Sequence, residues 1–290
     1  MFKNLNAEAL GISARSSELI ELALSFGFRG LDLDLFDFAD RAKTSGLAHA
    51  RRLFDSAKLS LSQFQLPVDL SANDADFAKE LARLEELAPV AEQAGAKRAL
   101  TIVRPTSDAL SYHQNFERHR QRLANLGELL AKHAIQLAVG FNAAADGPVE
   151  GEYEFIRDPT ALLLLLDLVG QDNVGMLVDI WQLHAAGASM AALPRLKGDR
   201  VVSVFVADAP ADVPPESLTS TARLLPNETG VIDTAAALTT LKAFEYKGPV
   251  TVVPHRGRFE KLSRDAIIRK TTESLDTVWK AAGVPVAAKR

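Results

Sequence analysis

Short apolar runs alternate with longer amphipathic stretches along the whole chain. The runs are rich in Val, Ile and Leu, as expected for the buried strands of a parallel sheet, and the stretches between them carry apolar residues at helical spacing. The pattern predicts strands over residues 9–12, 30–35, 59–66, 98–103, 135–141, 174–180, 201–206 and 249–253. It predicts helices over residues 17–26, 38–57, 75–94, 115–133, 159–169, 189–196, 234–244 and 264–282.

Residues typical of helix ends flank several of these stretches. Asp158 precedes Pro159, which is an N-cap residue followed by proline at the first helical position. Gly95 and Gly283 directly follow two predicted helices, where C-cap glycines are common. Pro194 interrupts the stretch 189–196 and makes it the least regular of the predicted helices.

The strict alternation of strand and helix predicts an α/β protein, a single (β/α)₈ TIM barrel over residues 1–290. An open doubly wound sheet is the alternative. That fold usually carries a G-x-G-x-x-G or P-loop motif, and the sequence has neither. The segment from Asp208 to Gly230 contains four prolines and no periodicity. We expect this long loop to lie over the C-terminal face, where barrels place their active sites.

Charge and composition exclude several classes of function. The chain has 33 basic and 37 acidic residues, a net charge of −4, which does not suit a nucleic-acid partner. The densest basic group, Arg118 to Arg122, is predicted to be the solvated face of a helix. The chain has no cysteine, which rules out disulfides, thiolate metal sites and cysteine nucleophiles.

The apolar runs are too short to span a membrane. The longest, Ala161 to Leu166, is far below the length that spans a bilayer, and the first residues carry no apolar leader. We therefore expect a soluble, cytoplasmic protein without a membrane partner. A homodimer formed through the helical faces is kept as a hypothesis.

Five short segments share a pattern that becomes specific when they are taken together. They read GFRGLD at 27–32, LVDIWQLH at 177–184, VFVADA at 204–209, GVID at 230–233 with Arg223 upstream, and EYKGPVTVV at 245–253. Their order resembles the motifs of the xylose-isomerase-like barrels, a superfamily of sugar isomerases, epimerases, inosose dehydratases and endonuclease-IV-type enzymes. The resemblance covers essentially the whole chain. It implies a barrel that acts on a small polyhydroxy or keto compound.

The resemblance also implies where a metal would be held. Members of this superfamily hold one divalent ion with a glutamate after strand five, an aspartate after strand six, a histidine after strand seven and a glutamate after strand eight. The ion polarises the substrate carbonyl, and the two glutamates move a proton. The corresponding residues here are Gly140, Asp179, Phe205 and Val253, with Gln182 in place of a substrate-facing histidine. With one ligand of four kept, we predict no tight metal site and no cofactor, while a weakly bound divalent metal stays open.

Polar residues still occupy the predicted strand ends and the long loop. If the protein is an enzyme, the candidates for acid and base are Asp179, His184 and His255. The candidates for substrate binding are Arg104, Asn142, Trp181, Gln182, Asp208, Arg223 and Arg256. Because arginines and histidines outnumber carboxylates in this set, we expect a sugar-like or anionic small molecule, such as a sugar acid, a sugar phosphate or a keto acid.

Two functions remain open on the sequence. One is a sugar or sugar-phosphate isomerase or epimerase that works with a rebuilt site. The other is a pseudoenzyme of the same fold that binds a carbohydrate-like ligand or regulates a partner, because fold alone does not decide function. A nuclease of the endonuclease IV type is rejected because the six histidines are scattered and form no metal-binding cluster.

Overall fold

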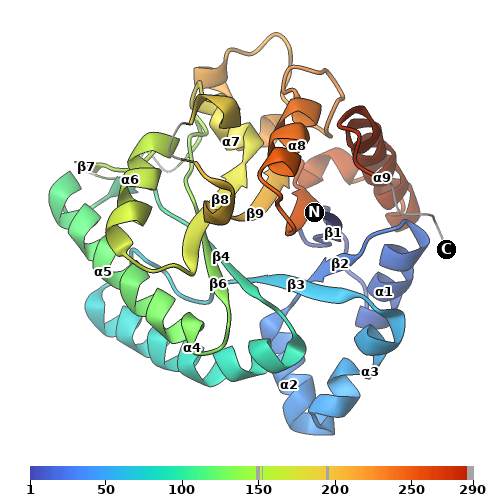
Figure 1. The fold of residues 1–290 in the computed structure, drawn as a ribbon, viewed down its shortest axis with the longest axis horizontal. Helices are drawn as coiled ribbons and strands as arrows, with labels where there is room; N and C mark the ends of the chain where they lie inside the picture. The colour runs from blue at the N-terminus through green and yellow to red at the C-terminus, as the bar shows by residue number, and fades with distance from the viewer. Residues whose placement is uncertain (148–150, 152, 194–195, 286–290) are drawn as a thin grey trace.

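Eight parallel strands close into a barrel in the computed structural model (Figure 1), and this confirms the predicted (β/α)₈ TIM barrel. The structure describes residues 1–147, 151, 153–193 and 196–285. The strands, in their order around the barrel, are β1 (Phe2–Leu5), β10 (Pro249–Val252), β9 (Val201–Val206), β8 (Val174–Asp179), β6 (Gln136–Gly140), β4 (Arg98–Ile102), β3 (Ser60–Gln65) and β2 (Gly30–Asp32). Two short strands, β5 (Thr106–Ser107) and β7 (Tyr153–Glu154), form an antiparallel pair outside the barrel.

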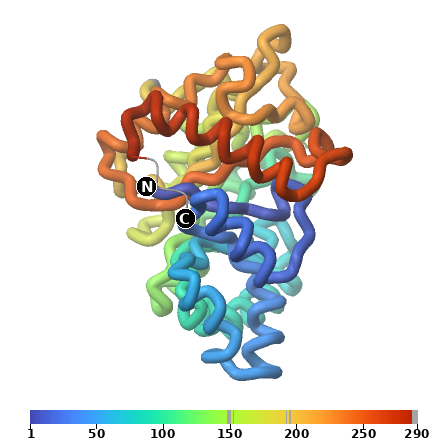
Figure 2. The backbone as a smooth tube through the Cα atoms, turned by 90° about the vertical axis from the view of Figure 1, so that its right-hand side faces the viewer, coloured from blue at the N-terminus to red at the C-terminus, as the bar shows by residue number. Residues whose placement is uncertain are grey.

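Helices surround the barrel (Figure 1). The α-helices are α1 (Ser16–Ser25), α2 (Leu35–Ser45), α3 (Leu47–Ala57), α4 (Asp74–Ala94), α5 (Tyr112–Ala131), α6 (Pro159–Val169), α7 (Ile180–Ala185), α8 (Thr234–Ala243) and α9 (Arg264–Ala281). Short 3₁₀ turns are η1 (Met190–Ala192), η2 (Gly198–Arg200), η3 (Pro215–Ser217), η4 (Ser220–Ala222) and η5 (Arg256–Phe259). In Figure 2 the last helix, α9, lies beside α1, and Arg264 donates a 2.8 Å hydrogen bond to Glu18 between them. Over the described residues, no helix has the length and apolar content needed to cross a membrane.

The first strand lies earlier than predicted. β1 is Phe2–Leu5, whereas residues 9–12 form a turn in which Gly11 has a φ of +69°. The polar residues Lys3 and Asn4 hid this strand, although both side chains are buried in the fold. Lys3 forms an ion pair with Asp276 of α9, and Asn4 takes part in a hydrogen-bonded network inside the barrel.

Two helix predictions also need correction. The predicted helix 38–57 is broken into α2 and α3 at Gly46, whose φ of 82° and ψ of 149° suit glycine and interrupt a helix. The helix after β8 is α7, which begins directly at Ile180, inside the predicted strand. Among the described residues of the predicted helix 189–196, the structure has the short turn η1 and no α-helix, and Pro194 lies outside the described residues.

The basic group on α5 is not a solvated face as a whole. His119 is fully buried, and the side chain of Arg122 is 5% exposed. Arg122 donates hydrogen bonds to the carbonyl oxygens of Leu70 and Ala72, at 2.8 and 2.7 Å, and also pairs with Asp74. Arg122 therefore stabilises the packing of α5 against the loop before α4.

The barrel interior has an apolar half and a polar half. A cluster separate from the main core contains Leu100, Ala138, Leu177 and Val202, from β4, β6, β8 and β9. On the other side, Asn4, Ser62, Gln63, Ser203 and Thr251 are buried and hydrogen-bonded to one another. Buried polar groups of this kind need partners, so the polar half fixes the relative positions of β1, β3, β9 and β10.

Candidate functional site

Residues of four neighbouring strands, β8, β9, β10 and β1, point into the barrel. In the sheet register Asp179 of β8 pairs with Phe205 of β9, Phe205 with Thr251 of β10, and Thr251 with Asn4 of β1. Residues paired in register on adjacent parallel strands point to the same face of the sheet. Ile102, at the end of β4, is 50% exposed, which shows that solvent enters the mouth of the barrel.

Asp179 links the end of β8 to the start of α7. Its Oδ1 accepts hydrogen bonds from the backbone N–H groups of Trp181 at 3.0 Å and Gln182 at 3.3 Å. This is the N-cap arrangement, in which a carboxylate satisfies the free amides of the first helical turn. One oxygen of Asp179 thus has a structural role, and the second is left for another partner.

That partner is Arg223, which belongs to the long segment 208–230. Its Nη2 donates to Oδ2 of Asp179 at 2.6 Å, and its Nη1 lies 3.4 Å from the carbonyl oxygen of Val253. The guanidinium carbon also lies 4.5 Å from the ring centre of Trp181, in cation–π geometry. Three predicted site residues, Asp179, Trp181 and Arg223, are therefore in direct contact.

The residues present do not fit the divalent metal of the superfamily. Gly140 has no side chain, and a Cβ added there would lie 3.2 Å from Leu177 and 3.4 Å from Ile102. Phe205 and Val253 offer no ligand atom in their side chains, and Asp179 is paired with a guanidinium. In the part of the chain that the structure describes, no three His, Asp or Glu side chains come close enough to hold a metal ion.

Asn142 and Gln182 interact with each other at the rim. The side-chain amide of Gln182 donates to Oδ1 of Asn142 at 3.3 Å, and its Oε1 accepts from the backbone N–H of Ala143 at 2.7 Å. This pair joins the loop after β6 to α7. Both side chains brace the mouth beside Asp179, and substrate binding by them stays a prediction.

Asp208 has a geometry that argues against the predicted substrate contact. It is fully buried, and its two oxygens accept from the backbone N–H groups of Ala209, Thr229, Gly230 and Ile232 at 2.8–2.9 Å. Burial works to raise its pKa, but these four N–H groups outweigh burial and lower it. Asp208 therefore holds the start of the long segment against its end. A backbone bridge between Asp208 and Leu224 adds to this connection.

The two histidine candidates lie on either side of this segment. His184 is in the last turn of α7 and half-buried, and burial lowers its pKa although the charge of Asp208 works to raise it. His255 follows β10, and its backbone N–H donates to the carbonyl oxygen of Arg223 at 3.1 Å. Over the described residues, neither imidazole is hydrogen-bonded to Asp179, whose partners are Trp181, Gln182 and Arg223. Their acid–base roles stay predictions.

The remaining two arginine candidates are peripheral. Arg104 is 60% exposed and donates to Asp69 at 2.9 Å, so its charge is already paired on the surface. Arg256 begins η5 and is exposed. Arg104 is therefore held away by Asp69. Arg256 follows His255, whose backbone bonds to Arg223, and substrate binding by its exposed side chain stays a prediction.

The predicted set omitted one carboxylate inside the barrel, Asp32 at the end of β2. Its Oδ1 accepts from Asn4 at 2.6 Å, and its Oδ2 accepts from Asn6 at 2.7 Å and from Gln63 at 3.3 Å. Burial raises its pKa to about 7, although the three amides act to lower it. One signal was visible in the sequence, because Asp32 is the acidic residue that closes the segment GFRGLD.

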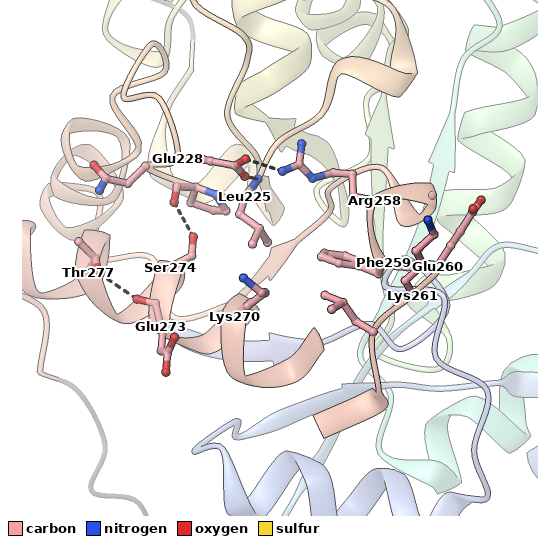
Figure 3. A pocket seen from close by; sticks show the side chains of 14 residues that line it. Leu225, Glu228, Arg258, Phe259, Glu260, Lys261, Lys270, Glu273, Ser274 and Thr277 are labelled. Carbon is pink, nitrogen blue, oxygen red and sulfur yellow. Dashed lines mark hydrogen bonds and ion pairs between the residues drawn. The ribbon is translucent and has the colours of Figure 1, made fainter. Parts of the chain in front are cut away.

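A hollow of about 800 Å³ also lies outside the barrel, between the segment after η4, the turn η5 and the helix α9 (Figure 3). Its charged side chains are of both signs, and Arg258 is already paired with Glu228 on its wall. Ser274 donates to the carbonyl oxygen of Pro226 across it. With balanced charges and none of the predicted site residues in its lining, this hollow is a weaker candidate than the mouth.

Comparison with protein families gives a match over most of the chain. The family described as xylose isomerase-like TIM barrel matches residues 20–278. A curated inosose isomerase from Bacillus velezensis is 30% identical over 114 residues, which are 39% of this chain and 40% of that protein. The aligned stretch thus spans about two fifths of the length of that relative.

Solved structures share the whole barrel at low identity. A xylose isomerase domain protein from Alicyclobacillus acidocaldarius superposes with a TM-score of 0.84 and 22% identity over 98% of this chain and 99% of the other. The IOLI protein, solved with a bound zinc atom, superposes with a TM-score of 0.81 and 19% identity over 97% of this chain and 99% of the other. At these identities the superpositions establish the fold alone.

Proposed function

The chain belongs to the xylose isomerase-like TIM barrel family, and on this premise we propose that it carries out isomerase- or epimerase-like chemistry on a small polyhydroxy or keto-acid compound. The kinship with an inosose isomerase supports this class of substrate. The reaction would depend on a fixed arginine, because the side chains that the family uses for its metal are largely absent.

One observation carries the proposal: Arg223 contacts two of the four positions that the family uses for metal ligands. It bonds to the carboxylate of Asp179 and to the backbone carbonyl of Val253. A guanidinium has five N–H donors, and the bonds to Asp179 and Val253 use two of them. The others are available for an oxygen of the ligand.

A positive group in this place has a chemical use. When a proton leaves the carbon next to a carbonyl, negative charge builds on the carbonyl oxygen. Fixed donors that face this oxygen stabilise the transition state more than the ground state. Asp179 and the ring of Trp181 hold the guanidinium in one orientation, so little reorganisation is needed during the reaction.

A non-catalytic ligand-binding protein is the second candidate. It is favoured by Gly140 and Val253, because these residues remove both of the glutamates that move the proton in the family. In this case Arg223 would bind an anionic or hydroxyl-rich ligand without turnover. Both candidate functions therefore predict ligand binding at Arg223. Only the enzyme converts the bound ligand into a product.

A panel of ketoses, inososes and hydroxypyruvate tests the proposal. Each compound is incubated with the protein and followed by NMR for isomer formation and, in D₂O, for deuterium at the carbon next to the carbonyl. We expect turnover of at least one compound, reduced about 100-fold or more in Arg223→Lys, because lysine lacks the planar fork. Arg51→Lys, an exposed arginine on α3, is the matched control. Saturable binding with neither isomer nor deuterium would favour the non-catalytic candidate.

A further inference from the structure

We propose that Asp32 is the group that takes up and returns the proton in this site, facing the Asp179–Arg223 pair across the mouth of the barrel. This inference rests on the proposed function and adds to it the acid–base group that the family positions no longer supply. Neither the family resemblance nor the predicted site residues had assigned Asp32 a role.

The topology puts the two groups on opposite sides of the barrel. In the closed order of eight strands, β2 and β8 are separated by β1, β10 and β9 on one side and by β3, β4 and β6 on the other. The register of β8, β9, β10 and β1 turns Asp179 and Asn4 to the same face of the sheet, the interior of the barrel. Asn4 in turn bonds to Asp32 at 2.6 Å. A small ligand in the mouth would therefore lie between a carboxylate and a guanidinium.

Asp32 differs from Asp179 in its partners. Three neutral amides, those of Asn4, Asn6 and Gln63, hold its oxygens in place. Among the ion pairs of the described residues none includes Asp32, whereas Asp179 is neutralised by Arg223. Asp32 is also partly open to solvent, although the amides of Asn4 and Gln63 are buried. It is thus a positioned carboxyl that no cation holds permanently in its ionised form.

The surroundings make this carboxyl able to gain and lose a proton near neutral pH. Burial raises its pKa to about 7, the three amides oppose this change, and the charge of Glu8 adds to it. The residues of β1, β3 and β10 that face it, Asn4, Gln63 and Thr251, do not titrate in this range. General acid–base groups work best when their pKa lies close to the operating pH.

The proposed step is a balanced proton transfer. The carboxylate of Asp32 takes the proton from the carbon next to the ligand carbonyl. The electron pair of the broken C–H bond forms the C=C double bond of an enediolate. The carbonyl oxygen takes the negative charge and faces Arg223. Return of the proton to the same carbon regenerates the ligand. Return to the neighbouring carbon, with the hydroxyl proton passing to the former carbonyl oxygen, gives the isomer.

The test measures deuterium exchange in D₂O, with hydroxypyruvate, D-fructose and an inosose as the probes. Asp32→Asn removes the titratable group at nearly constant volume, and Asp32→Glu keeps a carboxyl in a shifted position. Asp34→Asn is the matched control, because Asp34 is an exposed N-cap of α2 and asparagine is an equally good N-cap. Circular dichroism and binding of each probe are measured for all variants.

We expect Asp32→Asn to lower exchange about 100-fold or more while probe binding stays within a few-fold, since a positioned base contributes on this scale. Asp32→Glu should restore part of the rate, and wild-type exchange should rise with pH through an inflection at about 7. Exchange in Asp32→Asn within threefold of wild type, with the same pH profile, would overturn the role of Asp32 and leave the proposed function intact. Absence of exchange and of isomer in the wild type with every probe would overturn both.

Discussion

The guanidinium of Arg223 and the carboxylate of Asp179 form a 2.6 Å ion pair in which both side chains are 11% exposed. The pair joins residues from two elements, the end of β8 and the long segment before α8. It also fixes the start of α7, because the other oxygen of Asp179 is the helix cap. The contact is therefore a structural bond that holds β8, α7 and the long segment together.

Removal of Arg223 should destabilise the fold. Arg223→Ala leaves a largely buried carboxylate without its partner, which costs about 3 kcal/mol in the free energy of unfolding. Urea denaturation measures this change. Arg51→Ala is the control, since its ion pair with Asp55 on α3, with side chains 38% and 57% exposed, should contribute less than about 1 kcal/mol. Equal effects of the two substitutions would show that the Arg223 pair is not structurally important.

Asp208 should control the order of the long segment. Asp208→Ala removes the acceptor of four backbone N–H groups, and we expect a loss of about 3 kcal/mol and faster proteolysis between residues 209 and 230. Limited proteolysis with mass spectrometry identifies the cut sites. Asp212→Ala, an exposed residue of the same segment, is the control and should be cut at the wild-type rate.

Metal loading tests the interpretation of the altered ligand positions. After incubation with Mg²⁺, Mn²⁺, Co²⁺ or Zn²⁺ and desalting, we expect well below one bound ion per chain, because one carboxylate paired with an arginine binds a divalent ion weakly. Mass spectrometry gives the bound metal. Asp179→Ala should give the same value as wild type. One ion per wild-type chain, lost in Asp179→Ala, would mean that the assignment of the ligand positions is wrong.

The sequence predicted the barrel and most strands because outward-facing strand residues pack under the helices and read as apolar runs. Val178, Val204 and Val250 are examples, each fully buried. The apolar pattern did not predict β1. There Asn4 faces the interior and bonds to residues of strands that are distant in the sequence. Polar residues in a barrel interior interrupt the apolar sequence pattern of a strand although their side chains are buried.

The sequence indicated which residues lie near the site better than it indicated which of them bond to one another. Motif order placed Asp179, Trp181 and Arg223 near the mouth. The ion pair could not be predicted, because Arg223 and Asp179 are 44 positions apart in the sequence. Asp208 shows the same limit, since its role depends on backbone amides 21 to 24 residues away. Asp32 was missed because its unusual setting comes from the amides of Asn4, Asn6 and Gln63, which only folding brings together.

The titration of Asp32 should be visible in stability as well as in exchange. Its pKa is about 7 in the fold and close to 3.8 when unfolded, so the folded state binds more protons between these values. Its contribution is therefore complete below about pH 4 and is lost as the pH rises through 7. We expect the free energy of unfolding of wild type, relative to Asp32→Asn, to fall by about 2 kcal/mol from pH 4.5 to 8. This is less than the whole pKa difference would give, because solvent reaches the carboxyl. Urea unfolding at several pH values measures it, and parallel curves would contradict the assignment.

His119 should act in the opposite direction. The imidazole is fully buried beside Phe155, its Nδ1 donates to the carbonyl oxygen of Asn115 at 2.9 Å, and its Nε2 has no partner. Burial lowers its pKa to about 4 from 6.5, so the unfolded chain binds the extra proton between these values. Stability is complete above about pH 6.5 and is lost as the pH falls through 4, by about 3 kcal/mol in total.

Replacement of this histidine tests the effect directly. His119→Gln cannot be protonated, so the difference in stability between wild type and this variant should shrink by most of that amount as the pH falls from 7 to 4. His49→Gln is the matched control, because His49 is exposed on α3 and its replacement should leave the pH dependence unchanged. Acid unfolding followed by circular dichroism measures all three proteins. If His119→Gln and wild type lose stability in parallel as the pH falls, protonation of His119 does not destabilise the fold in acid. The cost of charging the buried Nε2 would then be offset by a partner gained on protonation.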